Sequence, residues 1–382
     1  MGASPAAAEQ RAMRAACQAG RCSLSAMPLV GLIEIVLGFG LVLAVLWDVF
    51  QTVVLPRPTP TRWRLAKNLT RYSYRFWRWR ALRLSDSNGR ERWLGIFGPS
   101  IVLVLLIAWI LILILGFGLI FHALADEFDP PVHSLGSAFY AAGVSLITIG
   151  FGDIVPTAGP TRLLVVIAAG SGLGTVALVI TYLFSLYGSF QRREILVTTL
   201  DARAGAPPSG IALLETYART EMVGELPRLF GQWETWAAEV LDSHVSYPVL
   251  VYFRSTHDNE SWISSVGAVL DAAVLSVTTI EDIPTGGAEM FVGIGAHLVE
   301  DISNFFGFPQ DELPGVEHDE FVAVRERLAT AGYAVKPAEL AWAAFIEDRR
   351  RYAARLNHLA GYLLTPPAQW VGDRETSRIH EA

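Results

Sequence analysis

Cysteine is nearly absent from this chain of 382 residues. The two cysteines, Cys17 and Cys22, both precede the first long apolar segment. Two thiols cannot build a disulfide framework or supply the four ligands of a structural zinc site. We therefore interpret them as incidental thiols in an N-terminal segment, residues 1–27, that we expect to be disordered.

Charge is also scarce, because 18% of the residues are charged and 52% are hydrophobic. Ordinary soluble domains carry about 25% charged residues, so the composition argues against a fully soluble protein. The charge is unevenly placed: residues 1–194 hold 17 of the 30 basic residues but only 10 of the 37 acidic ones. A basic, apolar first half and an acidic second half predict a membrane domain joined to a soluble one.

Three segments exceed the roughly 20 apolar residues that cross a bilayer. They run from about 29 to 55, 96 to 121 and 161 to 187. Between the last two lies Val132–Ile147, which is too short to span and fits a re-entrant pore helix. A cleaved signal peptide is the alternative for the first segment, but its apolar stretch is too long and no A-x-A site follows. The predicted fold is an all-α membrane protein with three transmembrane helices, a re-entrant pore helix and filter, and an α-helical soluble domain.

The loop after the first segment fixes the expected orientation. Residues 56–93 contain eleven Lys or Arg, opposed only by Asp86 and Glu91. The positive-inside rule places this loop in the cytoplasm. We therefore expect a multi-pass protein of the cell (inner) membrane, with the N-terminus outside and the C-terminal half in the cytoplasm.

Within this loop, the stretch Arg71–Arg83 mixes cations with aromatic rings. Its cations are too dense and irregular for a voltage-sensor helix, and nucleic-acid binding is the weaker alternative. An interfacial helix on anionic lipid fits better. We expect the bilayer, and no nucleic acid, as its partner.

The hexapeptide Thr148-Ile149-Gly150-Phe151-Gly152-Asp153 lies between the last two spans. A dehydrated cation needs a cage of oxygens, which stacked backbone carbonyls can supply. Consecutive carbonyls point the same way when the backbone alternates in handedness, and the left-handed positions favour glycine. Residues Thr148 to Gly152 are therefore the predicted ion-binding residues. Ile149 and Phe151 would point away from the ion, and K⁺ would be the permeant ion, with no other metal or cofactor.

The stretch from about Leu94 to Arg193 resembles the pore module of the prokaryotic two-helix potassium channel family, whose filter pattern is T-[VI]-G-[YF]-G-D. The resemblance implies a homotetramer in which each chain contributes one filter. Phe151 lacks the phenolic hydroxyl of some relatives, and Val144 stands where some have a Glu that pairs with the filter Asp. Both departures leave open how the filter is braced.

Other parts of the pore take roles by position. Asp129-Pro130-Pro131 predicts the start of the pore helix, since proline is tolerated in a first turn. Carboxylates would concentrate cations at the outer mouth: Asp126, Glu127, Asp129 and Asp153. Gly172 aligns with the family's gating hinge, although close helix packing is the alternative. For Gly170 and Gly174 we expect packing.

The predicted domains are residues 28–55 for the first helix, 56–94 for the basic interfacial segment, 95–194 for the pore module, 195–210 for a linker and 211–382 for a cytoplasmic helical domain. Helices are expected at 211–244, 262–279, 286–306, 321–331 and 338–364. The domain lacks the glycine spacing of a nucleotide-binding Rossmann turn. Its most polar cluster is either a ligand or metal site or a loop with a helix cap: Arg254, His257, Asp258, Glu260 and Trp262.

These features predict a potassium-selective channel gated by its inner helix and cytoplasmic domain, whose ligand is unknown. No nucleophile–base pair supports an enzyme. One alternative is a potassium transporter subunit, but such chains carry four filter repeats and this one has one. Another is a membrane-anchored sensor. Glu34 and Asp48 in the first span are either structural anchors or parts of a proton relay.

Overall fold

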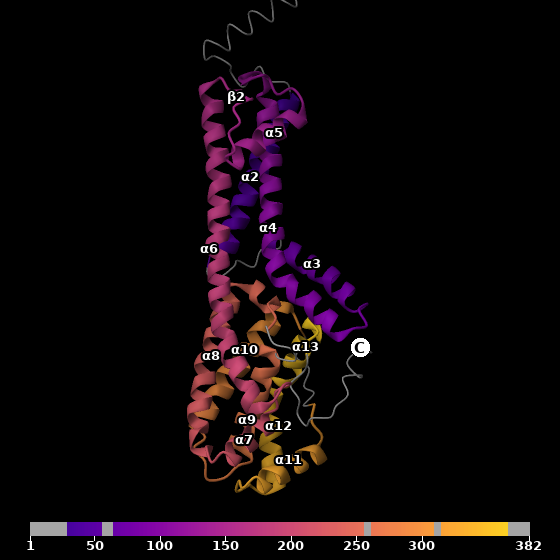
Figure 1. Ribbon diagram of the computed structural model, residues 1–382, viewed down its shortest axis with the longest axis vertical. Coiled ribbons are helices and arrows are strands. Elements are labelled where there is room, and N and C mark those ends of the chain that lie inside the picture. Colours follow the sequence, from indigo (N-terminus) through magenta and orange to yellow (C-terminus); the bar gives the residue numbers. More distant parts are fainter. Residues whose placement is uncertain (1–28, 56–63, 256–260, 309–314, 366–382) are drawn as a thin grey trace, which may run out of the picture. The chain divides into compact units, whose positions relative to one another are not determined.

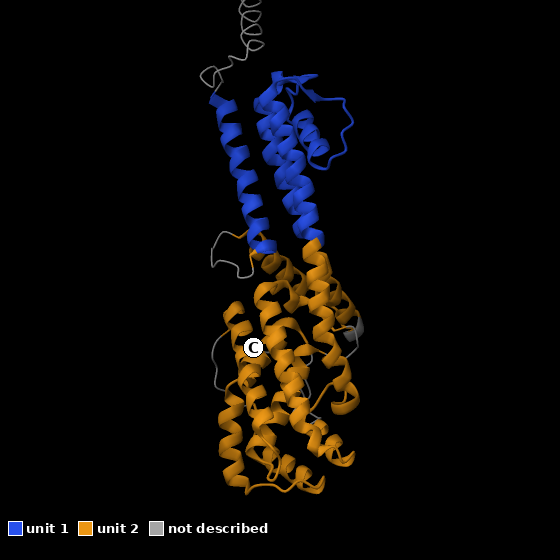
Figure 2. Ribbon diagram, turned by 90° about the vertical axis from the view of Figure 1, so that its left-hand side faces the viewer, with its two compact units in different colours: residues 1–54, 104–180 blue, residues 55–103, 181–382 orange. Residues whose placement is uncertain are grey.

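The computed structural model describes residues 29–55, 64–255, 261–308 and 315–365 (Figure 1). The predictions for residues 1–27, Cys17, Cys22 and the cluster residues His257, Asp258 and Glu260 lie outside these ranges. The chain divides into two compact units, residues 1–54 with 104–180 and residues 55–103 with 181–382 (Figure 2). Two long helices, α4 (Ser87–Ala123) and α6 (Gly159–Ala204), contribute residues to both units.

The first unit is built from apolar helices. It contains α2 (Leu29–Val49) with a π-helical end at Phe50–Val54, the last part of α4, the short helix α5 (Leu135–Leu146) and the first part of α6. Three helices of the described chain, reaching from Leu29 to Val54, from Gly89 to Ala123 and from Gly159 to Ala204, are long and apolar enough to cross a membrane. The all-α membrane fold predicted from the sequence is confirmed.

Glycines allow the helices of the first unit to approach closely. A Cβ on Gly38 of α2 would lie 2.5 Å from the carbonyl oxygen of Gly116 on α4. A Cβ on Gly118 of α4 would collide with the ring of Phe139 on α5. Such small-residue contacts are a common way for membrane helices to pack, since lipid tails provide no hydrophobic drive between them.

The pore helix starts later than its prolines predicted. Ser134 is the N-cap of α5, and its hydroxyl oxygen accepts from the Ser137 amide at 3.1 Å. Asp129 instead belongs to a two-residue strand, β1 (Phe128–Asp129), which pairs antiparallel with β2 (Val155–Pro156). A serine hydroxyl satisfies an unpaired amide of the first turn, which proline cannot do. The predicted start at Asp129-Pro130-Pro131 was therefore wrong, whereas the end near Ile147 was correct.

The second unit is built mainly from helices. It contains α3 (Leu65–Ala81), the first part of α4, the last part of α6, α7 (Gly210–Arg219), α8 (Leu226–Ser246), α9 (Trp262–Thr278), α10 (Gly286–Phe306), α11 (His318–Thr330), α12 (Ala338–Arg350) and α13 (Ala353–Leu363). Nearly every residue of α9 is buried, and it contacts α7, α10, α12 and α13. A helix that is apolar on all sides is suited to this central position.

Charged groups inside the second unit are paired. Asp271 of α9 accepts hydrogen bonds from Arg349 Nε at 3.0 Å and from the Tyr352 hydroxyl at 2.6 Å. Burial raises the pKa of Tyr352 well above its ordinary value, so this hydroxyl remains a donor. The cluster fastens α12 and the start of α13 to the central helix.

Two of the helices predicted for residues 211–382, which we call the tail, are interrupted. In addition, one predicted transmembrane helix is longer than its apolar stretch. The helix expected over 211–244 is α7 and α8, separated at Glu221, whose φ is +56°. The helix expected over 338–364 is α12 and α13. The third span continues as helix to Ala204, into the segment expected as a linker.

Candidate ion pathway

The filter segment has the alternating backbone that stacked carbonyls require. Positive φ values occur at Thr148 (60°), Gly150 (66°) and Gly152 (77°). The Ile149 amide donates to the Val144 carbonyl of the pore helix at 2.9 Å, which fixes where the segment begins. The glycine positions agree with the sequence reasoning, while the left-handed Thr148 was missed. Threonine gives no sequence signal for this conformation, because β-branched residues normally avoid it.

Ile149 and Phe151 are largely exposed in the single chain, at 50% and 66%. Large apolar side chains next to a glycine-rich segment would be covered if further copies of the chain surrounded it.

Tyr140 holds the end of the filter segment. Its hydroxyl donates to Asp153 Oδ2 at 2.8 Å, linking the pore helix to the residue after Gly152. This hydrogen bond raises the pKa of Tyr140. The sequence reasoning noted the missing Glu at position 144 but did not foresee that Tyr140 would supply the partner. The contact joins residues thirteen apart through a turn, so residue spacing alone gave no signal for it.

Tyr140→Phe is expected to keep the fold and to loosen the filter. The phenylalanine removes only the hydroxyl and, with it, the hydrogen bond to Asp153. Rb⁺ flux through reconstituted protein should fall several-fold, and the fraction of protein that stays conducting should decline faster at low K⁺. Tyr187→Phe, which removes a hydroxyl far from the filter in sequence, is the control. Unchanged flux and unchanged loss of activity in Tyr140→Phe would show that Asp153 needs no such partner.

The predicted mouth carboxylates do not have equal roles. Asp126, Asp129 and Asp153 are exposed, whereas Glu127 is partly buried and accepts a hydrogen bond from the Thr161 hydroxyl at the start of α6. Burial raises the pKa of Glu127. The Thr157 amide donates to the Glu127 carbonyl at 2.8 Å. Glu127 therefore fastens the loop after the filter, and the three aspartates are the groups available to attract cations.

Gly172 makes a close helix contact in this structure. A Cβ at this position would collide with the main-chain carbonyl of Leu146 at the end of the pore helix. Among the residues that the structure describes, none lies within 4 Å of the corresponding position at Gly170 or Gly174. The packing interpretation thus has direct support at Gly172, and the hinge remains a prediction.

The two carboxylates of the first span each meet α4. Asp48 Oδ2 accepts from the Trp109 indole nitrogen at 2.9 Å. Glu34 Oε2 lies 2.9 Å from His122 Nδ1. Both contacts attach the additional first helix to the outer helix of the pore module, which agrees with the anchoring interpretation.

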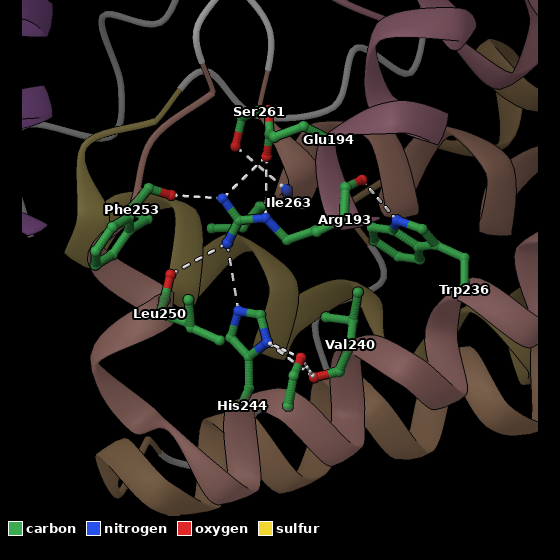
Figure 3. Close-up of polar contacts among 10 residues, drawn as sticks. Arg193, Glu194, Trp236, Val240, His244, Leu250, Phe253, Ser261 and Ile263 are labelled. Atoms are coloured by element: carbon green, nitrogen blue, oxygen red, sulfur yellow. Dashed lines mark hydrogen bonds and ion pairs between the residues drawn. The ribbon is translucent and has the colours of Figure 1, made fainter. Parts of the chain in front are cut away.

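In the second unit, the continuation of α6 is fixed by a buried arginine (Figure 3). Arg193 is 2% exposed, and its guanidinium donates to the carbonyls of Leu250 (3.1 Å) and Phe253 (2.7 Å). It also contacts Glu194 Oε1 at 3.0 Å and His244 Nε2 at 3.3 Å. From the sequence alone, Arg193 is only the last residue of the stretch that resembles a pore module.

The protonation of His244 follows from these contacts. Burial and then the charge of Arg193 lower the pKa of His244 to about 3, against a hydrogen bond to Val240 that raises it. A neutral ring can donate from Nδ1 to the Val240 carbonyl, 2.8 Å away, and accept from Arg193 at Nε2. His244 is therefore a neutral acceptor for the buried guanidinium near pH 7.

Phe253 joins three elements of the second unit. On α4, a Cβ added to Gly98 would lie 2.8 Å from the Phe253 ring. On α6, the ring centroids of Tyr187 and Phe190 lie 5.9 and 5.8 Å from the centroid of the Phe253 ring. Its carbonyl is the Arg193 acceptor. Phe253 thus packs against the parts of α4 and α6 that belong to the second unit.

The polar cluster predicted in the tail is not assembled as a ligand site by its described members. Arg254 forms a bidentate pair with Glu91 of α4, at 2.7 and 2.6 Å, and Trp262 is buried beside Arg193. Within the described residues, no group of three or more His, Cys, Asp or Glu side chains could hold a metal ion.

Three apolar helices, a short helix ending at a left-handed glycine segment, and a paired loop beyond it define a membrane protein with an ion channel pore. Comparison with known proteins agrees, since residues 109–188 match the family described as "Ion channel". The resemblance to two-helix potassium channels is thereby confirmed for the pore segment, which carries an extra N-terminal helix and a helical C-terminal domain.

The chain is 26% identical over 203 residues to the uncharacterized membrane protein YdjJ of Bacillus subtilis, covering 52% of this chain and 58% of that protein. It is 37% identical over 75 residues to potassium voltage-gated channel subfamily A member 2 of Xenopus laevis and 36% to that of Mus musculus. These matches cover 20% of this chain and 15% of either channel. No solved structure gave a significant match.

Proposed function

We propose that this chain forms a potassium-selective channel. K⁺ would pass passively through a fourfold pore lined by the carbonyls of Thr148 to Gly152. The observation that carries the proposal is the alternating left-handed backbone at Thr148, Gly150 and Gly152. Because one chain provides one filter strand, several copies must surround the ion to replace its water. The potassium channels among the similar proteins support the choice of ion.

A liposome flux assay tests this function. Purified full-length protein should pass K⁺ and Rb⁺ far faster than Na⁺, and its native mass should be that of a tetramer. Equal passage of Na⁺ would overturn the selectivity. A dimer, or flux that requires a second transported ion, would favour a transporter subunit.

The gate that we propose is the inner helix α6, moved by the cytoplasmic domain. Two observations support it: α6 is uninterrupted from Gly159 to Ala204, and its Arg193 is embedded among carbonyls and side chains of the tail. A change in the tail would therefore act on the same helix that reaches the filter region. In this arrangement the N-terminus lies outside the inner membrane and the tail lies in the cytoplasm.

Anionic lipid is the second partner we propose, bound along α3. One side of this helix is held to the tail: the Tyr74 hydroxyl and Arg78 Nε both donate to the Tyr362 carbonyl, at 3.2 and 3.1 Å. The other side exposes arginines and aromatic rings: Arg71, Tyr72, Arg75, Phe76, Trp79, Arg80 and Arg83. Arg83 lies over the Trp79 ring at 3.7 Å. Rings at headgroup depth beside arginines are typical of interfacial helices.

Arg71→Gln with Arg75→Gln is expected to weaken retention of anionic lipid. Each arginine near an anionic surface contributes about 1 kcal/mol, so the double variant should bind phosphatidylglycerol roughly thirtyfold less tightly. Native mass spectrometry of protein from mixed phosphatidylcholine and phosphatidylglycerol nanodiscs measures this. Arg219→Gln with Arg228→Gln removes the same charge from the tail helices and should retain lipid normally. Equal retention by both double variants would refute the lipid site.

A further inference from the structure

His122 stands at a junction between the additional first helix and the loop that leads into the pore helix. It is the penultimate residue of α4, and its ring is partly buried. Nδ1 lies 2.9 Å from Glu34 Oε2 on α2, and Nε2 lies 3.3 Å from the carbonyl oxygen of His133. His133 directly precedes Ser134, the N-cap of the pore helix. All of these residues belong to the first unit.

The two partners of the ring fix how many protons this site holds. A carbonyl oxygen can only accept, so Nε2 must carry a proton. A carboxylate can also only accept, so Nδ1 must carry a second proton, unless that proton sits on Glu34 instead. Both arrangements contain the same number of protons, shared by the pair as one titrating unit. A neutral imidazole beside an ionised Glu34 has one proton too few for both contacts.

Few charged groups face the ring. The nearest is the Glu34 carboxylate on α2. Among the described contacts, the other titratable side chains near this junction are His133 and Asp126, whose imidazole Nε2 and carboxylate Oδ1 lie 3.6 Å apart. Glu127 is engaged with Thr161 on α6. The proton is therefore held by Glu34 and His122.

We propose that the Glu34–His122 pair is a proton-binding site through which pH on its side of the membrane acts on the pore helix. With the proton bound, one ring ties α2 to the loop before Ser134. When the proton leaves, the remaining N–H keeps the charge-assisted bond to Glu34, and the bond to the His133 carbonyl is lost. The start of the pore helix is then released from the outer helix, and the filter loses that support.

The sign of the effect follows from the proton count. The tie is complete at low pH and is lost as pH rises through the titration of the pair. Loss of this one hydrogen bond from the charged ring changes the equilibrium constant between the bound and the released loop by about tenfold or more. For a chain that conducts K⁺ as proposed, the flux should be higher when the solution on the filter side of the membrane is acid than when it is alkaline. This flux readout rests on the proposed function, whereas the protonation of the ring does not.

The experiment uses full-length protein in liposomes, with pH varied on one side from about 5 to about 9, a range that brackets histidine titration. Wild-type Rb⁺ flux should rise severalfold on acidification of the filter side. His122→Gln cannot hold the proton and should give a flat profile. Glu34→Gln offers an amide N–H to Nδ1, so a ring that carries its proton only at Nε2 can make both contacts, and the tie should persist at alkaline pH. His133→Gln leaves the carbonyl in place and should keep the wild-type profile.

Histidine ¹⁵N NMR of the same protein is the second readout. At acid pH the His122 signals, assigned by their loss in His122→Gln, should show protons on both ring nitrogens, or one at Nε2 and one shared with Glu34. A His122 that stays neutral and unlinked to Glu34 across the range would overturn the proposal. So would a pH-dependent profile that survives in His122→Gln or disappears in His133→Gln. Absence of flux in every protein at every pH would instead count against the channel function, and the NMR titration would still decide the proton site.

Discussion

Gly152→Ala is expected to abolish K⁺ flux while leaving the fold and the assembly intact. Gly152 has a φ of +77°, and no atom of the described residues lies within 4 Å of the place where a Cβ would stand. The expected effect is therefore conformational rather than steric. An L-residue in the left-handed region costs about 1–2 kcal/mol, or about 4–8 kcal/mol over the four copies of the proposed pore.

A cost of that size would turn the carbonyls away from the ion path. We expect Rb⁺ flux to fall more than about 100-fold, since each 1.4 kcal/mol corresponds to a factor of ten. Circular dichroism and native mass should match the wild type. Gly159→Ala is the matched control, because Gly159 also has open space for a Cβ but begins a helix and needs no positive φ. Wild-type flux through Gly152→Ala would remove the basis for the proposed filter.

The left-handed glycines of the proposed filter could be predicted from the sequence because this chemistry leaves a local signature. Two glycines at alternate positions, a threonine before them and an aspartate after them are all visible within six residues. What could not be predicted is how the segment is supported. The Tyr140–Asp153 bond and the contact of Gly172 with Leu146 depend on how helices pack, which residue spacing does not encode.

Helix boundaries, too, include some that the sequence predicts and some that it does not. The helix predicted over 286–306 agrees with α10 at both ends, where Thr285-Gly286-Gly287 and Gly307 mark the turns. The third transmembrane helix was predicted to end with its apolar stretch, but helix formation does not require apolar residues. Arginine, glutamate and leucine after Tyr187 are good helix formers, so α6 continues to Ala204.

Arg193→Met is expected to destabilise the second unit strongly. The guanidinium is nearly fully buried and donates to the carbonyls of Leu250 and Phe253, to Glu194 and to His244 (Figure 3). Methionine fills a similar volume but offers no donor, so buried acceptors and the Glu194 carboxylate lose their partner. Removing one member of a buried ion pair costs about 3–5 kcal/mol.

For a unit of this size, such a loss corresponds to a fall in melting temperature of roughly 10 °C. Differential scanning fluorimetry of the detergent-solubilised protein would measure it, with Trp236 as a natural reporter because its indole donates to the Arg193 carbonyl at 2.8 Å. Arg192→Met is the matched control. Arg192 is the neighbouring residue on the same helix, but it is exposed and donates only to Ser189 in the described contacts.

Arg193→Met also distinguishes a role of Arg193 in moving α6 from a role in stabilising the tail alone. If the tail moves α6 through Arg193, Arg193→Met should change the rate of Rb⁺ flux by severalfold while the preference for Rb⁺ over Na⁺ stays that of the wild type, since the filter lies in the other unit. Arg192→Met should change neither. A destabilised tail with wild-type flux would mean that Arg193 only stabilises the domain. An altered ion preference would mean that the filter itself depends on this anchor, and either result would contradict gating through α6.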